Sequence, residues 1–131
     1  MNGQKKKVLV VEDSKGLAFI MQMVLQAGGF DVRTANDGWD GFFTYLAFNP
    51  DLVITDIDMP RENGVEMIKR IRVQNPEVRT IYMSGELSWF WPLLEEEKKR
   101  CGVSFLKKPF SRIELLRAVA ELFNNNKEVS E

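Results

Sequence analysis

The feature that most constrains the fold is a short apolar stretch that runs into an aspartate. Residues 52–54 are Leu-Val-Ile, a continuous run rich in β-branched side chains, with Pro50 shortly before it and Asp56 shortly after it. Such a run is typical of a strand that is buried on both faces at the centre of a parallel sheet. Ligands of open α/β sheets bind outside the carboxyl ends of the strands, so Asp56 is expected where chemistry takes place.

Five strand patterns alternate with five helix patterns along the chain. Strands are expected at residues 8–11, 31–35, 52–54, 79–83 and 103–107, the second of them nearer an edge. Helices are expected after Ser14, Asp37, Asn63 and Ser111, and one more lies within residues 89–101, starting at Pro92. This alternation with short connections predicts an α/β fold, a doubly wound five-stranded parallel sheet with right-handed crossovers. The 131 residues form one domain, with a core at about residues 6–124 and a polar tail from Asn124.

Apolar residues at helical spacing indicate which side of each helix faces the sheet. The stripes are Leu17, Met21, Val24 and Leu25; Trp39, Phe42, Phe43 and Leu46; Val65, Ile68 and Ile71; and Ile113, Leu116, Ala120 and Phe123. Phe19, Ile20 and Met23 make the first helix apolar nearly all round, so part of it either packs or forms a docking surface. The same two interpretations stay open for residues 89–91, Trp-Phe-Trp. The charged run at 95–100 is interpreted as a solvated helix face.

Composition excludes several classes of function. The net charge is −1, which predicts no general attraction to DNA or to anionic lipid. There is no histidine, so histidine-based catalysis and histidine metal ligands are absent from this chain. Cys101 is the only cysteine, and no segment has the pattern of an export signal or a membrane span. We therefore expect a cytoplasmic protein without an internal disulfide.

The residues that follow the strands form a chemically coherent set. Glu12 and Asp13 follow the first strand, Asp56 and Asp58 the third, Ser84 the fourth and Lys108 the fifth. Carboxylates gathered at one sheet edge repel one another and raise each other's pKa, and a hard divalent cation relieves that repulsion. A set of oxygen ligands favours Mg²⁺. A lysine ammonium and a serine hydroxyl facing the cation suit the oxygens of a phosphoryl group.

In this order, these motifs resemble the receiver domain of two-component response regulators over nearly the whole chain. The matching motifs are Glu12-Asp13, residues 56–60 with Gly64 four positions later, Ser84-Gly85 and Lys108-Pro109. The resemblance implies a flavodoxin-like sheet of strand order 2-1-3-4-5. It further implies that Asp56 is the phosphoacceptor, with Mg²⁺ held by Asp13, Asp56, Glu12 through water, and the backbone carbonyl of Asp58. Ser84 and Lys108 would bind the phosphoryl oxygens, and Phe105 would be the aromatic switch.

The resemblance also implies a cis peptide bond at Lys108-Pro109 and a phosphorylation cycle with outside partners. Since this chain has no histidine, the phosphoryl donor would be a sensor histidine kinase or a histidine phosphotransfer protein. The signal would leave through a downstream protein target, as in a phosphorelay, without direct contact with DNA or a membrane. The segment from Ser84 to Lys108 is slightly longer than is usual in the family, so details of that face do not carry over.

Other functions compete with this interpretation. The Asp56-Ile57-Asp58 motif is similar to the nucleophile motif of haloacid-dehalogenase-like phosphatases, but Pro60 stands where a threonine or valine is usual. A metal-dependent nuclease would need a basic surface, which this chain lacks. A receiver-like module that binds partners without phosphorylation stays open. We expect a phosphoacceptor with slow self-dephosphorylation and not an enzyme that turns over a separate substrate.

Overall fold

The computed structural model describes residues 4–59, 61–85 and 91–129. In this part of the chain the elements alternate in the predicted order, and their bounds are β1 (Lys7–Val11), α1 (Lys15–Ala27), β2 (Asp31–Ala35), α2 (Gly38–Phe48), β3 (Leu52–Asp56), α3 (Gly64–Gln74), β4 (Arg79–Ser84), α4 (Trp91–Lys98), β5 (Val103–Lys107) and α5 (Arg112–Val129). No helix in these ranges is both long and apolar enough to cross a membrane.

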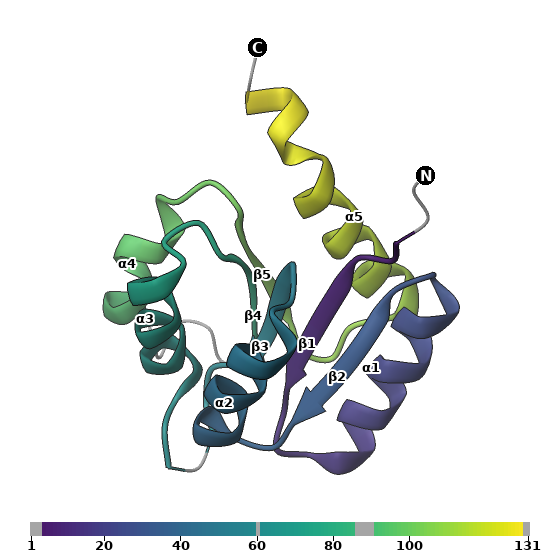
Figure 1. Ribbon diagram of the computed structural model, residues 1–131, viewed down its shortest axis with the longest axis horizontal. Coiled ribbons are helices and arrows are strands. Elements are labelled where there is room, and N and C mark those ends of the chain that lie inside the picture. The colour runs from purple at the N-terminus through teal and green to yellow at the C-terminus, as the bar shows by residue number, and fades with distance from the viewer. Residues whose placement is uncertain (1–3, 60, 86–90, 130–131) are drawn as a thin grey trace.

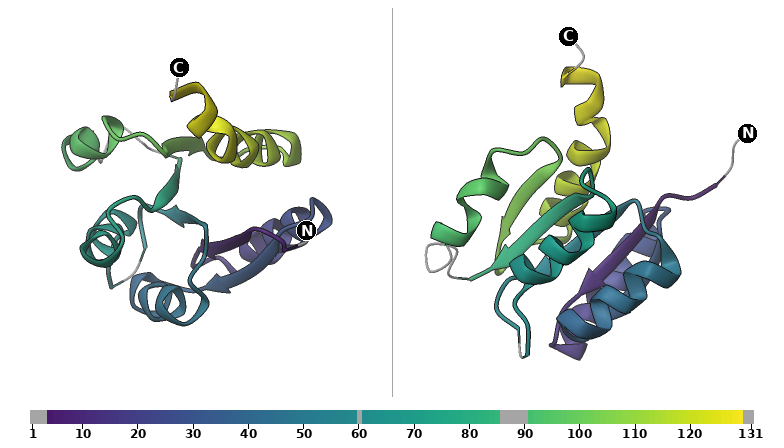
Figure 2. Two further views of the ribbon diagram at one scale, coloured as in Figure 1. Left: turned by 45° about the horizontal axis from the view of Figure 1, so that its top comes forward. Right: turned by 60° about the vertical axis from the view of Figure 1, so that its left-hand side comes forward.

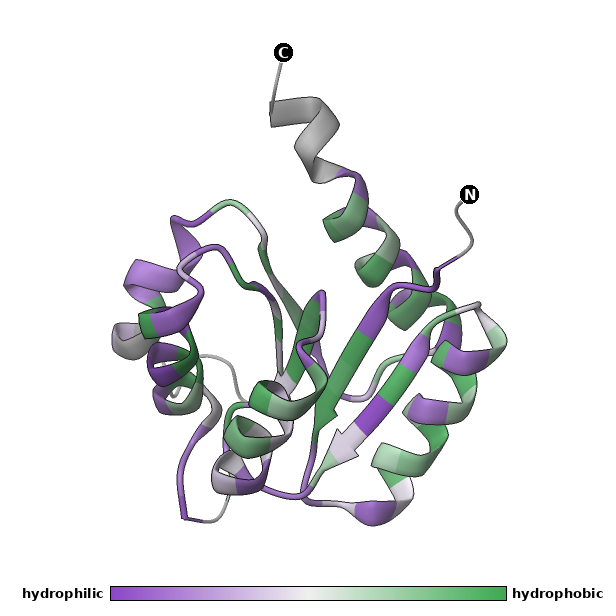
Figure 3. Ribbon diagram, in the orientation of Figure 1, coloured by the Kyte–Doolittle hydropathy of each residue, from purple (hydrophilic) through white to green (hydrophobic). Residues whose placement is uncertain are grey.

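The five strands form one parallel sheet in the order β2-β1-β3-β4-β5, which confirms the predicted fold. Helices α1 and α5 cover one face of the sheet, and α2, α3 and α4 cover the other (Figures 1 and 2). Side chains of β1 alternate between the two faces: Val8 and Val10 pack toward α1 and α5, and Leu9 and Val11 pack toward the other layer. Burial on both faces explains why β1 is a continuous hydrophobic run (Figure 3).

The predicted helix starts are confirmed by their capping contacts. Each predicted N-cap side chain accepts a hydrogen bond from the backbone N–H three positions on, at 3.4 Å for Ser14, 2.9 Å for Asp37, 2.9 Å for Asn63 and 3.0 Å for Ser111. At Ser111 the bond is reciprocal, because its own N–H donates to the Glu114 carboxylate at 2.7 Å. These bonds satisfy backbone donors that a helix start otherwise leaves open.

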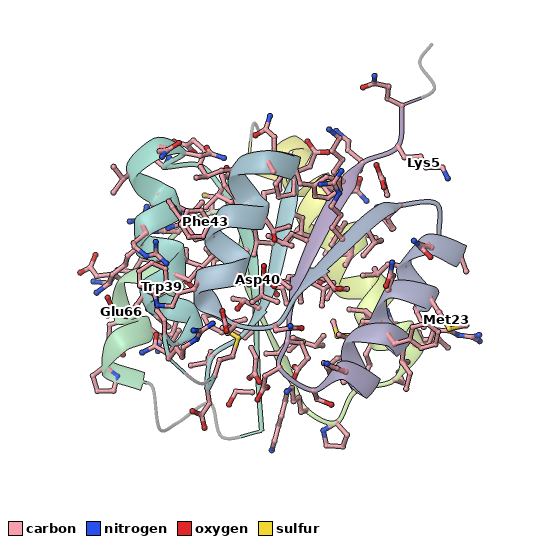
Figure 4. The ribbon with its side chains drawn as sticks, turned by 60° about the horizontal axis from the view of Figure 1, so that its bottom comes forward. Lys5, Met23, Trp39, Asp40, Phe43 and Glu66 are labelled. Atoms are coloured by element: carbon pink, nitrogen blue, oxygen red, sulfur yellow. The ribbon has the colours of Figure 1, made fainter. Side chains whose placement is uncertain are left out.

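Helix α2 packs with a different face from the one predicted. Its buried residues include Gly41 and Tyr45, whereas Trp39, Phe43 and Leu46 are 49%, 58% and 44% exposed. The reason is steric: a Cβ on Gly41 would lie 2.7 Å from the Met67 sulfur, so this face lets the helix approach the sheet and α3 closely. The bulky aromatic residues are left on the outer side, and Trp39 and Phe43 are labelled there in Figure 4.

Helix α5 is rotated relative to the predicted stripe and is longer. Its inner face is Leu115, Val119 and Leu122, while Ile113 is largely exposed. Both stripes are apolar at helical spacing, and only contact with the sheet decides between them. The helix continues to Val129, past the start of the expected polar tail, because no glycine or proline interrupts it.

Helix α4 has Pro92 in its first turn, close to its predicted start, but it ends at Lys98, earlier than expected. Trp89 and Phe90 lie outside the described residues.

Candidate functional site

The parallel sheet brings the predicted site residues together at the carboxyl ends of its strands. Asp56 is the last residue of β3 and is paired in register with Met83, one position before Ser84 at the end of β4. Ser84 in turn lies opposite Lys107 of β5, so Lys108 emerges beside it. Because neighbouring parallel strands end together, residues from distant parts of the chain meet here.

Three carboxylates lie close together at this end of the sheet. Glu12, Asp13 and Asp56 each offer an oxygen atom, and these three atoms lie within 4.8 Å of one another. Glu12 and Asp56 are buried, whereas Asp13 is exposed and open to solvent. Three hard oxygen ligands with one open side fit a Mg²⁺ ion that keeps some of its waters.

Asp58 lies just past Asp56 with its side chain exposed, and its backbone N–H donates a hydrogen bond to the Asp56 carboxylate. The role of its carbonyl as a metal ligand stays a prediction.

Lys108 lies across the two buried carboxylates. Its Nζ donates to Glu12 Oε1 at 2.8 Å and to Asp56 Oδ2 at 3.2 Å. The Lys108-Pro109 peptide bond is cis, as predicted. The backbone N–H of Lys108 donates to the Ser84 carbonyl at 3.0 Å, which fastens the end of β5 to the end of β4. The lysine is therefore held in place by its main chain as well as by its charge.

The pKa values of the site follow from burial and from this ion pairing. Burial raises the pKa of Asp56, and the charge and hydrogen bond of Lys108 offset this only in part. Burial raises the pKa of Glu12 in the same way, again with Lys108 opposing it. For Lys108, burial alone would lower the pKa, but the hydrogen bond to Glu12 and the charges of Asp56 and Glu12 outweigh it and raise the pKa. Lys108 is accordingly a permanent cation in this site.

The loop that follows Asp56 is fastened to the neighbouring helices. A Cβ on Gly64 would collide with the backbone carbonyl oxygen of Asp56, so only glycine lets α3 begin this close to the end of β3. Arg61, at a φ of 72°, donates from Nε and Nη2 to one oxygen of the α2 N-cap Asp37 at 3.2 and 2.8 Å. These anchors limit how far the site can shift.

Ser84 and Phe105, the two residues predicted to form the switch, lie on the neighbouring strands β4 and β5. Ser84 is buried at the carboxyl end of β4. Phe105 of β5 is half-buried, and its ring stacks on Tyr82 of β4 with centroids 5.8 Å apart and an interplanar angle of 23°. Tyr82 is the cross-strand partner of Phe105 in the sheet register. Whether Phe105 changes position on phosphorylation stays a prediction.

A buried polar cluster beside the site was missed by the sequence analysis. Glu97 is 3% exposed, so the interpretation of residues 95–100 as a solvated face is wrong at this position. Its carboxylate accepts hydrogen bonds from Arg72 of α3 and from the hydroxyl of Tyr82. Two signals in the sequence point to this: Leu94 and Glu97 share a helix face, and a tyrosine in a buried strand needs a partner for its hydroxyl.

Comparison with known proteins agrees with the geometry. The family model for the response regulator receiver domain matches residues 8–120. The DNA-binding transcriptional regulator NtrC of Azospirillum brasilense is 31% identical over 91% of this chain, and the sporulation initiation phosphotransferase F of Bacillus subtilis is 29% identical over 87%. The alignment spans 24% of the length of the NtrC relative and 90% of the phosphotransferase.

Among solved structures, chemotaxis protein CheY4 of Vibrio cholerae superposes with a TM-score of 0.82 at 26% identity, covering 91% of this chain and 99% of that one. A receiver domain protein of Clostridium thermocellum gives a TM-score of 0.80 at 25% identity, covering 95% and 98%.

Proposed function

Since the chain belongs to the response regulator receiver family and is a phosphoacceptor signalling domain, we propose that Asp56 is the residue that accepts the phosphoryl group. The observation that carries the proposal is the position of its carboxylate, 3.2 Å from the Lys108 ammonium and within 4.8 Å of the oxygens of Glu12 and Asp13. No other aspartate among the described residues combines a strand end, a bound lysine and a set of metal ligands.

The reaction follows from this arrangement. An oxygen of Asp56 forms a bond to phosphorus while the bond from phosphorus to the donor's histidine nitrogen breaks, and the nitrogen keeps the electron pair and later takes a proton. Lys108 moves its charge from the carboxylates to an oxygen of the incoming group, and the Ser84 hydroxyl donates to another. Glu12, Asp13 and Asp56 would hold Mg²⁺, which would supply positive charge against the negative charge of the phosphoryl group.

The phosphoryl donor in this proposal is a histidine kinase or a histidine phosphotransfer protein, which is the kind of partner that receiver domains have. Its docking surface is the outer side of α1, where Phe19, Ile20 and Met23 are all largely exposed. Met23 is labelled on that side of α1 in Figure 4. The relative named as a phosphotransferase supports a place in a relay that passes a phosphoryl group on. The output partner is a protein and not DNA, in keeping with the net charge of −1.

The test is incubation with Mg²⁺ and a small acyl phosphate donor, followed by the mass of the intact chain. We expect one added phosphoryl group on the parent and none on Asp56→Asn. A parent chain that gains no mass, or a variant that gains as much as the parent, would refute the assignment. The same incubation with a stable phosphate ester separates the phosphatase alternative, because a receiver domain releases no phosphate from the ester on repeated turnover.

A further inference from the structure

The polar cluster beside the site joins three elements through one carboxylate. Glu97 of α4 accepts from Arg72 of α3, with 2.7 Å from Nη2 to Oε1 and 3.2 Å from Nε to Oε2. The same Oε1 accepts from the hydroxyl of Tyr82 of β4 at 2.8 Å. Arg100, just past α4, donates from Nε to Oε2 at 3.1 Å. A single side chain of α4 is thus tied to α3 and to the sheet.

The cluster is buried and its buried polar side-chain atoms are paired, so it resists displacement. Glu97 is 3% exposed, Arg72 is 9% exposed and Tyr82 is fully buried. The remaining donor of Arg72, Nη1, is taken up by the backbone carbonyls of Pro76 at 2.9 Å and Val78 at 3.3 Å. A buried charge that loses a partner is costly, because the low dielectric strengthens the charge and leaves it unsolvated.

Few of the α4 side chains that the structure describes are buried. Among its side chains that the structure describes, Leu94 and Glu97 are the buried ones. Leu94 is apolar, and apolar packing is non-directional and tolerates sliding. The hydrogen bonds of Glu97 have fixed lengths and directions. Glu97 and its partners therefore give α4 a directional attachment to α3 and to the sheet.

Tyr82 connects this cluster to the phosphorylation site. It lies two residues before Ser84 in β4, and its ring stacks on Phe105, three residues before Lys108. Of the two residues proposed to bind phosphoryl oxygens, Ser84 ends β4 and Lys108 directly follows β5, and these two strands carry the ring pair. A shift of Ser84 or Phe105 on phosphorylation would therefore alter the surroundings of Tyr82, whose hydroxyl bonds β4 to α4.

We propose that the hydrogen bond from the Tyr82 hydroxyl to Glu97 holds α4 in the position of the unphosphorylated chain and opposes phosphorylation of Asp56. The inference rests on the proposed function. A bond that is present in one state and weakened in the other biases the equilibrium between them, and by linkage it lowers the affinity for whatever favours the second state. Removing the hydroxyl therefore raises the affinity for a phosphoryl group.

The test compares Tyr82→Phe with Tyr45→Phe. Tyr45 is also buried, but it lies on α2, and its hydroxyl accepts a hydrogen bond from Asn75 Nδ2 at 2.9 Å instead of donating to Glu97. The probe is beryllium fluoride, a stable mimic of a phosphoryl group on a carboxylate, titrated calorimetrically at saturating Mg²⁺. Hydrogen bonds to charged groups are strong enough for us to expect binding about three- to tenfold tighter for Tyr82→Phe, and parental affinity for Tyr45→Phe.

A second readout and a second variant guard against a purely structural effect. In Tyr82→Phe the amides of α4 should exchange hydrogen faster without the mimic, while those of α2 should not. Arg100→Ala removes the peripheral bond to Glu97 and should tighten binding by a smaller factor in the same direction. Unchanged or weaker binding by Tyr82→Phe would overturn the inference, since the bond would then persist in both states. A parent chain that does not bind the mimic would overturn the proposed function and the inference together.

Discussion

Replacing Asp56 by asparagine should stabilise the fold when no divalent cation is present. The variant removes one charge from a site where three carboxylates lie close together and Lys108 pairs with two of them. Asparagine keeps the shape of the side chain, and its carbonyl oxygen can still accept from Lys108 and from the backbone of Asp58. The phosphoacceptor is thus predicted to be a source of instability in the resting protein.

The magnitude follows from the distances in the site. At an effective dielectric constant of about 20, repulsion between Asp56 and Glu12 is about 3.5 kcal/mol at the 4.8 Å limit, and attraction to Lys108 at 3.2 Å is about 5 kcal/mol. Asp13 is exposed, so its repulsion is screened to about 1 kcal/mol. These charge interactions nearly cancel, and the burial of Asp56 then decides the sign. We expect the free energy of unfolding of the variant to be about 2 kcal/mol higher than that of the parent, which is a fraction of the cost of burying an ion.

The assay is urea unfolding at pH 7 in a chelator and again in Mg²⁺. A cation at a hundred times its dissociation constant stabilises the parent by about 2.7 kcal/mol, and the variant gains less because it has lost one ligand. The stability difference should therefore shrink or reverse in Mg²⁺. The control is Asp31→Asn, which removes an exposed charge at the other end of the sheet. Its free energy of unfolding should match that of the parent in both buffers. An Asp56→Asn variant no more stable than the parent in chelator, or a difference that Mg²⁺ leaves unchanged, would refute this reasoning.

Three more predictions test other parts of the account. The pKa of Asp56 is raised above its ordinary value of 3.8, so as the pH falls from 7 its carboxyl group takes up a proton in the folded chain before it does so in the unfolded chain. The parent then no longer bears the cost of a buried charge, and the stability advantage of Asp56→Asn in urea titrations should shrink. A constant difference would contradict the pKa shift. Asn63→Ala removes the N-cap of α3 and should lower the free energy of unfolding by about 1 kcal/mol, while an unchanged urea midpoint would show that the cap contributes nothing. Met23→Glu on α1 should slow phosphoryl transfer from a histidine donor but not from a small acyl phosphate, with the equally exposed Ile113→Glu as control; equal slowing with both donors would argue against docking.

The grouping of site residues at the carboxyl ends of the strands could be predicted from the sequence, because strands buried on both faces have a strong hydrophobic signature. The runs that end near Asp56 and at Glu12 are continuous and apolar, and parallel topology then places their carboxyl ends together. The contact of Lys108 with both carboxylates follows from the same topology. Its cis peptide bond came from the family resemblance and not from the chain's own pattern.

Helix faces and buried charges were harder to predict. In α2 the hydrophobic pattern favours Trp39 and Phe43 as core residues, but the close approach that Gly41 permits turns these side chains outward. Glycine carries almost no signal in a hydrophobicity pattern, although it decides this packing. Glu97 was interpreted as solvated because its neighbours along the chain are charged, and its partners Arg72 and Tyr82 are separated from it by long stretches of sequence. Pairings of that kind become visible only in three dimensions.

The most direct test of the central claim is chemical identification of the phosphorylated residue. The chain is phosphorylated by a small acyl phosphate donor in Mg²⁺, and borohydride then reduces the acyl phosphate of an aspartate to homoserine, which peptide mass spectrometry locates. We predict homoserine at position 56 and at no other aspartate, and none when a chelator replaces Mg²⁺. Homoserine at Asp13 or Asp58, or a parent chain without homoserine after phosphorylation, would contradict the account.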